Sequence, residues 1–248
     1  MLKIDLHIHT IYSGHAYGTF YDILKEAKSK KMDMIAVTDH GPSLVGSANI
    51  IHFKMGYRAP KDYEGMKILW GCEANIISKD GTIDLDEKTI EKLDILLVGL
   101  HNETPYKDLG INGNTESIIN CFKRYPIHIF THPTTIYYKY DTDKVFQAAC
   151  DNDILLELNL SSLMKLEQGH HRENLDYLKK MIEIVKKNKK KIIINSDAHF
   201  LSEIGEDAIL KKYWNELKLN DDLIINNHPE ELMQFIASKD LKNFSIKK

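Results

Sequence analysis

The stretch Asp5-Leu6-His7-Ile8-His9-Thr10 lies in the first apolar run of the chain, Lys3–Thr10, and decides the fold. Its alternation predicts a β-strand whose polar residues Asp5, His7 and His9, spaced two apart, share one face. Burial of such side chains is costly unless they bind something. Two imidazoles at a strand end can reach one metal ion, and Asp5 beneath them is expected to orient an imidazole through its second nitrogen.

The rest of the chain continues this pattern as strands alternating with amphipathic helices such as Asp22–Lys31 and Asn174–Lys187. The predicted strands are Lys3–Thr10, Met34–Thr38, Lys67–Ala74, Ile95–His101, His128–His132, Ile154–Leu160 and Lys191–Ser196. Such alternation implies parallel strands joined by helical crossovers. We therefore predict an α/β fold, a distorted (β/α)7 TIM-like barrel forming a single domain over residues 1–248. An open doubly wound sheet is the alternative.

Side chains that bind metals recur at the ends of these predicted strands. They are His7, His9, His15, His40, Glu73, His101, His132, Asp197 and His199. A barrel gathers the carboxyl ends of its strands into one rim, so these residues are expected in one pocket. Nine ligands exceed the needs of one ion, which predicts a multinuclear metal site. Asp39 and His40 are neighbours that cannot both face inward, so we expect His40 to be the ligand and Asp39 its support.

Composition excludes several classes of function. The 248 residues are 43% hydrophobic and 28% charged, as in an ordinary globular protein. A net charge of −3 gives no reason to expect binding to long nucleic acid or to a membrane. The N-terminus enters a strand without a signal-like segment, and Cys72, Cys121 and Cys150 form no CxxC motif. These features predict a cytoplasmic protein with reduced thiols.

Several motifs together resemble a known family. Asp5–Thr10, Thr38-Asp39-His40, Glu73, His101, Thr131-His132-Pro133 and Ser196-Asp197-Ala198-His199 resemble the polymerase and histidinol phosphatase (PHP) superfamily. Asp39-His40-Gly41-Pro42, Ile51-His52-Phe53, Gly71–Ile76 and Glu157–Ser162 look like its YcdX-type phosphatase branch. This resemblance implies a distorted seven-stranded barrel that holds three zinc ions.

The resemblance also implies an assignment of the ligands. His7, His9, Glu73 and Asp197 are expected to hold one ion, and His15, His40 and His199 a second. His101 and His132 are expected to hold the third, with Glu73 bridging to the first. Glu73, Asp197 and His199 are the residues that we expect to be most directly involved in catalysis.

The expected chemistry follows from these ligands. Imidazole-rich sites suit zinc first, with manganese or iron as alternatives, so the three divalent ions that the resemblance implies are expected to be zinc. Such a site has an excess of positive charge that favours a small phosphate monoester, attacked by a metal-activated hydroxide. Asn159 is expected to line the pocket. His52 and Arg58 are expected either to contact the phosphate or leaving group, or to be ordinary loop residues. Loops Gly56–Arg58 and Thr134–Tyr138 are expected to influence substrate choice.

Two other functions remain open at this stage. An amidohydrolase or deacetylase also uses an HxH strand in a barrel, but such sites often contain a carbamylated lysine where this chain has Glu73 and His101. A non-catalytic metal-binding PHP module is the other alternative. The segment around Trp214 and Leu217 either covers the barrel or forms the surface of a homo-oligomer.

Overall fold

The computed structural model describes residues 2–134, 137–170 and 173–246. Its strands are β1 Ile4–Ile8, β2 Met34–Val37, β3 Asp62–Tyr63, β4 Met66–Asn75, β5 Ile95–Gly99, β6 Ile129–Phe130, β7 Leu155–Asn159 and β8 Ile192–Asn195. Its α-helices are α1 Phe20–Ser29, α2 Ile50–Lys54, α3 Glu87–Ile90, α4 Gly110–Arg124, α5 Thr142–Asp151, α6 Leu160–Glu167, α7 Asn174–Lys187, α8 Leu210–Tyr213 and α9 Pro229–Ser238.

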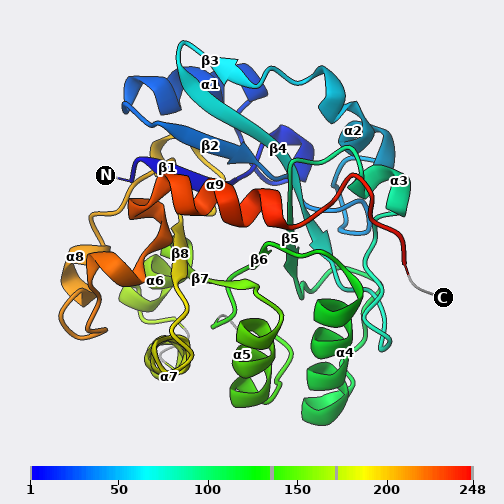
Figure 1. The fold of residues 1–248 in the computed structure, drawn as a ribbon, viewed down its shortest axis with the longest axis vertical. Helices are drawn as coiled ribbons and strands as arrows, with labels where there is room; N and C mark the ends of the chain where they lie inside the picture. The colour runs from blue at the N-terminus through cyan, green and yellow to red at the C-terminus, as the bar shows by residue number, and fades with distance from the viewer. Residues whose placement is uncertain (1, 135–136, 171–172, 247–248) are drawn as a thin grey trace.

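Seven of the strands are parallel and follow one another in the order β1-β2-β4-β5-β6-β7-β8. They curve into a nearly closed barrel with helices on its outside (Figure 1). β3 is antiparallel to the start of β4 and lies off this path. All seven predicted strands are therefore confirmed, as is the distorted TIM-like barrel.

The barrel closes between β1 and β8 without a continuous ladder. Ile8 and Ala198 form a single parallel bridge at the carboxyl end of the two strands. Nearer the amino end of the two strands, the side-chain amide of Asn226 bridges their backbones. It donates to the carbonyl oxygens of Ile4 and Ile194, at 3.0 and 2.7 Å, and accepts from Ile194 N at 2.9 Å. This amide satisfies backbone groups that would otherwise be buried without partners.

A β-bulge interrupts β1. Its pairing register with β2 shifts between Asp5 and Ile8. Leu6 packs in the cluster inside the barrel together with Leu97 and Ile193, whereas Ile8 packs outside it against α1. An extra residue at a bulge reverses the inward and outward alternation of side chains.

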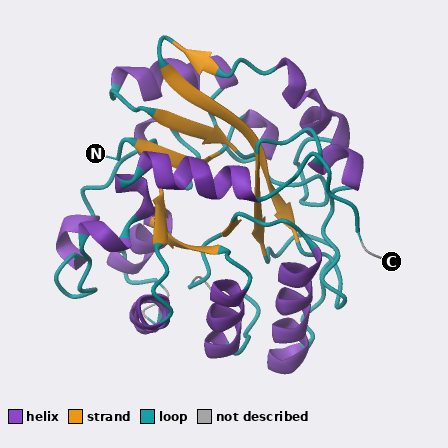
Figure 2. Ribbon diagram, viewed as in Figure 1, coloured by secondary structure: helices purple, strands orange, loops and turns teal. Residues whose placement is uncertain are grey.

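The two ends of the barrel differ. Leu232 and Ile236 of α9 pack into the inner cluster and cover the amino end of the strands (Figure 2). His128, at the same end, accepts from Leu96 N with Nδ1 and lies 3.1 Å from Ile236 O with Nε2. Among the described residues, no helix packs into the carboxyl end in this way, which leaves that end available for a site.

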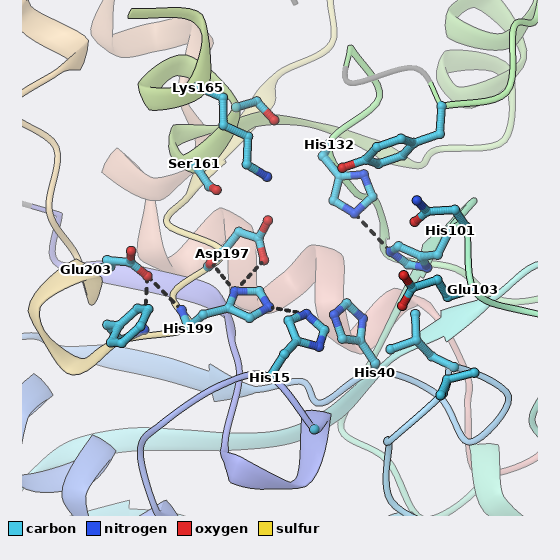
Figure 3. A pocket seen from close by; sticks show the side chains of 17 residues that line it. His15, His40, His101, Glu103, His132, Ser161, Lys165, Asp197, His199 and Glu203 are labelled. Atoms are coloured by element: carbon cyan, nitrogen blue, oxygen red, sulfur yellow. Dashed lines mark hydrogen bonds and ion pairs between the residues drawn. The ribbon is translucent and has the colours of Figure 1, made fainter. Parts of the chain in front are cut away.

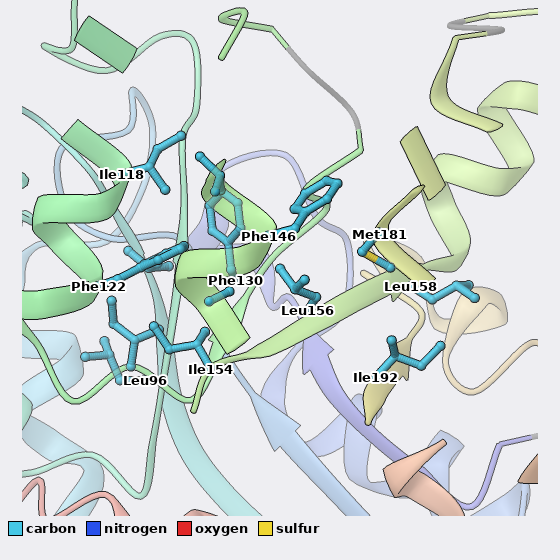
Figure 4. Close-up of a cluster of buried hydrophobic side chains, with 14 of the residues drawn as sticks. Leu96, Ile118, Phe122, Phe130, Phe146, Ile154, Leu156, Leu158, Met181 and Ile192 are labelled. Atoms are coloured by element: carbon cyan, nitrogen blue, oxygen red, sulfur yellow. The ribbon is translucent and has the colours of Figure 1, made fainter. Parts of the chain in front are cut away.

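Apolar faces of the helices build the outer core. Phe122 of α4, Phe146 of α5 and Met181 of α7 pack on the outside of the strands around Phe130 (Figure 4). Helix α7 has the predicted bounds. Helix α1 begins two residues earlier than predicted because Thr19 and Asp22 form a capping box that fixes its start.

Trp214, Leu217 and the three cysteines all pack in or against the outer core of the protein. Leu217 is buried in the outer core and Trp214 packs against it, so this segment covers the barrel. The three cysteines are buried and free. None of the helices in the described ranges combines the length and apolar character needed to cross a lipid bilayer.

Candidate metal centre

The nine predicted ligands meet at the carboxyl end of the strands, although they are spread over almost the whole sequence. Buried Glu73, near the end of β4, lies at the centre of the group. Its Oε1 lies 3.1 Å from His101 Nε2 and 2.9 Å from His132 Nε2. Its Oε2 lies 3.2 Å from His7 Nε2 and 2.8 Å from His40 Nδ1. One carboxylate thus has four imidazole nitrogens within 3.2 Å, as a bridging ligand would.

The histidines of the first strand are held by their second ring nitrogen. His7 Nδ1 lies 2.9 Å from Glu157 Oε1, and an ionised carboxylate only accepts hydrogen bonds. His9 Nδ1 lies 2.9 Å from Ser13 Oγ, whose own proton is donated to Asp39. Both imidazoles are therefore expected to carry their proton on Nδ1. Each then turns the bare lone pair of Nε2 toward the carboxylates of Glu73 and Asp197.

Two further imidazoles repeat this arrangement. His101 Nδ1 donates to Asn75 Oδ1 at 2.7 Å, and its Nε2 faces His132 Nε2 at 3.0 Å. His199 Nδ1 donates to the carbonyl oxygen of Asp197 at 2.9 Å, and its Nε2 faces His15 Nε2 at 3.0 Å. Imidazoles that bind metals usually donate their other nitrogen to such acceptors.

The cluster leaves buried polar atoms without hydrogen bonds. These atoms are His7 Nε2, His9 Nε2, His40 Nδ1 and Glu73 Oε2. Lone pairs at such distances repel one another unless a cation or a proton lies between them. The donor set thus fits divalent cations, and the structure chemically supports metal binding.

Protons alone do not satisfy the whole cluster. Burial would lower the pKa of His7, but Glu73, Glu157 and Asp197 raise it well above its usual value. Burial lowers the pKa of His9 well below its usual value, and the neighbouring His40 and His199 lower it further. Some imidazoles are therefore held neutral, as ligation requires, and metal binding must displace the proton that His7 takes up.

Among the described residues, atoms close enough to share one ion form three overlapping groups. The groups are His7, His9 and Asp197; His40, Glu73 and His101; and His9, His40 and His199. The first agrees with the ligand set implied by the family resemblance. The other two groups differ from that set, because His40 lies 2.8 Å from Glu73 and was expected with His15 and His199. His15 is exposed at the rim of the site, where its ring stacks on that of His199.

Two of these positions have unusual backbone conformations. Asp197 has φ 58° and His132 has φ 30°, both in the left-handed region. Non-glycine residues in this region are uncommon and cluster at functional sites. β8 ends at Asn195, so Asp197 reaches the cluster from the loop that follows the strand.

The predicted role of Asp5 is wrong. Its carboxylate accepts from Ser196 N at 3.1 Å and Gly205 N at 3.0 Å, and from the Ser196 hydroxyl, and it contacts no imidazole. The bulge in β1 turns Asp5 to the face opposite to His7 and His9. Asp5 thus fastens the loop after β8 to β1.

Glu157 of β7 takes the role expected of Asp5. Its Oε1 accepts from His7 Nδ1 at 2.9 Å and from Asn195 Nδ2 at 2.8 Å. Its Oε2 accepts from His132 N at 2.7 Å and from Asn159 Nδ2 at 2.9 Å. The sequence contained a signal for Glu157, because it is the one charged residue in the apolar run Ile154–Leu160.

Asp39 supports the site indirectly. It accepts from Thr10 and from Ser13, and Ser13 Oγ in turn contacts His9 Nδ1 and accepts from His40 N at 3.1 Å. His52 Nε2 lies 3.1 Å from Asp39 Oδ2. His52 therefore contacts the site only through Asp39. It does not line the cavity, so the structure gives the expected contact with substrate no support.

Two other predicted contacts also lie away from the cavity. Arg58 is exposed in the 3-10 helix Met55–Arg58 and is absent from the cavity lining. Asn159 is buried and donates to Glu157 Oε2 and, at 3.2 Å, to Asp197 Oδ2. It holds carboxylates in place and does not line the pocket as expected.

A cavity of about 500 Å³ opens above the cluster (Figure 3). His15, His40, His101, His132, Asp197 and His199 form its floor. Its walls include four residues that the sequence did not single out: Glu103, Ser161, Lys165 and Glu203. Of the predicted substrate loop Thr134–Tyr138, residues 135 and 136 lie outside the described residues, and Tyr137 lines the cavity.

Fold and site together define a class: an α/β barrel with a histidine- and carboxylate-rich, metal-binding centre at the carboxyl end of its strands. The chain belongs to the PHP domain family, whose model matches residues 5–228. It is 31% identical over 236 residues to a "probable phosphatase" of Clostridium botulinum (strain Okra / Type B1), covering 95% of both chains. It is 33% identical over 241 residues to a "probable phosphatase" of Thermoanaerobacter sp. (strain X514), covering 97% of both.

A solved structure shares the fold. Histidinol phosphate phosphatase from Lactococcus lactis, complexed with zinc, L-histidinol and phosphate, aligns with a TM-score of 0.56 at 12% identity. The alignment covers 85% of this chain and 93% of that one. The family, the relatives and the metal-binding cluster identify the chain as a metal-dependent hydrolase of the phosphatase type.

Proposed function

We propose that this protein hydrolyses a small phosphate monoester with the help of three divalent ions, zinc being the first choice and manganese or iron the alternatives. The observation that carries the proposal is that the imidazoles of His7, His9 and His101 use Nδ1 to bond outward and turn a bare Nε2 toward Glu73 or Asp197. Imidazole-rich sites favour late metals over magnesium or calcium. His7, His9, His15, His40, Glu73, His101, His132, Asp197 and His199 would hold the ions.

Charge favours an anionic substrate. Three divalent ions would bring six positive charges, and the buried carboxylates Glu73, Asp197 and Glu157 remove three, which leaves a net charge of about +3. A phosphate monoester dianion matches such a site better than a neutral amide does. Bound ions would supply Lewis acidity, both to activate a water molecule for in-line attack on phosphorus and to neutralise the phosphoryl oxygens.

The chain's own residues prepare this reaction. Glu73 holds four imidazoles around one carboxylate, and Glu157, Ser13 and Asn75 fix the rings that carry the ligand atoms. Rings held by hydrogen bonds need little reorganisation when the transition state forms. The size of the cavity, about 500 Å³, suits a small substrate. A small phosphorylated partner, a cytoplasmic location and a homo-oligomer remain part of the proposal.

The test combines elemental analysis of purified protein with hydrolysis of an aryl phosphate monoester. We expect about three zinc-like ions per chain and turnover that a chelator abolishes and added metal restores. One or two ions without phosphate release would favour the amidohydrolase alternative. A full set of ions without turnover on a panel of phosphate monoesters would favour a non-catalytic metal-binding module.

A further inference from the structure

Helix α6 presents an unpaired cation to the cavity. Lys165 and Ser161 are four residues apart on this helix, so they lie on one face, and both line the cavity wall above the metal-binding cluster (Figure 3). Lys165 is exposed, and no hydrogen bond or ion pair joins either side chain to another of the described residues. By contrast, Lys212 pairs with Glu167, the last residue of the same helix, at 2.9 Å.

The position of Lys165 favours binding of an anion. It is the single lysine or arginine among the described residues that line the cavity. Its ammonium group lies above a floor that becomes strongly cationic once ions bind, and an anion between them relieves the repulsion. The amino end of α6, which begins at Leu160, adds a partial positive charge on the same wall.

The transferred phosphoryl group does not need this lysine. The net charge of about +3 expected for the metal-loaded cluster already exceeds in size the two negative charges of a phosphate dianion. Lys165 stands on the exposed rim, where the part of the substrate beyond the scissile bond would lie. In Figure 3, Glu103 lies beside His101 and away from Lys165, and its carboxylate repels anions there. The carboxylate of Glu203, which also lines the cavity, accepts from the backbone N of His199 and Phe200. A second negative group is thus directed toward α6.

We propose that Lys165 and Ser161 recognise a second anionic group on the leaving-group side of the substrate. The preferred substrate class is then a small phosphate monoester that carries another phosphate or a carboxylate a few bonds away. This inference rests on the proposed phosphatase function and adds to it the residues that set specificity.

The experiment measures binding of non-hydrolysable probes to the metal-loaded protein by isothermal titration calorimetry. Propylphosphonate carries one anionic group, and propane-1,3-bisphosphonate carries two. Wild type is expected to bind the bisphosphonate at least about tenfold more tightly, the size of one charge-assisted hydrogen bond. Ethane and butane bisphosphonates test the spacing.

Variants assign the gain to α6. Lys165→Met should remove most of the tenfold preference and leave propylphosphonate binding within about twofold, Lys165→Arg should retain it, and Ser161→Ala should reduce it about threefold. Lys25→Met is the matched control, because Lys25 lies on the exposed face of α1 outside the cavity lining. It should bind both probes as wild type does.

The results separate this inference from the function on which it rests. Equal weakening of both probes by Lys165→Met would overturn it, because the lysine would then hold the transferred group. Unchanged binding of both probes would overturn it as well. Wild type that binds the monophosphonate and gains nothing from the second group refutes the specificity proposal alone. Wild type that binds no phosphonate and hydrolyses no monoester refutes the phosphatase proposal itself.

Discussion

Glu157→Gln tests whether buried hydrogen bonds hold the predicted ligands in place. The carboxylate of Glu157 receives four donors at 2.7 to 2.9 Å, two on each oxygen. Glutamine has the same shape but must place an NH2 group opposite two of those donors. If the glutamine NH2 group took the position of Oε2, it would face His132 N, a backbone group that can only donate. The NH2 group is therefore expected at the position of Oε1, on the side of His7.

The expected consequence is a change in the His7 ring. His7 would keep its hydrogen bond only by accepting at Nδ1, which puts its proton on Nε2, the atom that faces Glu73. A protonated Nε2 cannot bind a metal. Loss of such a supporting contact typically costs about 10- to 100-fold in metal affinity, which corresponds to about 1.4 to 2.7 kcal/mol.

The assay is a zinc titration against a competing chelator, with the thermal stability of metal-free protein measured in parallel. Glu116→Gln, on the exposed surface of α4, is the control and should bind zinc as wild type does. Zinc affinity of Glu157→Gln within about twofold of wild type, in a folded protein, would refute the orienting role of Glu157.

Three further predictions concern other parts of the molecule. Metal removal by a chelator should lower the melting temperature, because ions at a thousand times their dissociation constant add about 4 kcal/mol of stability; an unchanged melting curve after verified metal loss would contradict this. Asn226→Ala should cost about 2–4 kcal/mol in urea unfolding, since it leaves Ile4 O and the backbone of Ile194 unpaired; a loss under about 0.5 kcal/mol would show that the β1–β8 seam does not need the amide. Burial lowers the pKa of His128 from 6.5 to about 4, so the unfolded chain takes up a proton that the folded one refuses. Roughly 3 kcal/mol of stability is then lost as pH falls from 6.5 to 4, and His128→Gln, less stable at pH 7, should lack this part of the pH dependence in denaturant titrations.

The sequence alone determined the architecture and the composition of the site. Apolar runs of strand length alternate with amphipathic segments, and this periodicity depends on local geometry that needs no knowledge of contacts. It therefore predicted all seven parallel strands and the bounds of α7. Metal-binding residue types at the strand ends predicted the cluster around Glu73 for the same reason, because parallel strands bring their carboxyl ends together.

Tertiary structure alone decided which side chains support that cluster. The bulge in β1 depends on how β1 pairs with β2, so the period-two pattern placed Asp5 on the wrong face. Glu157 meets His7 across 150 positions of sequence. The direction of Lys165 depends on how α6 packs against the barrel. These contacts are set by how segments distant in sequence pack together, and the spacing of residues within one segment does not encode that packing.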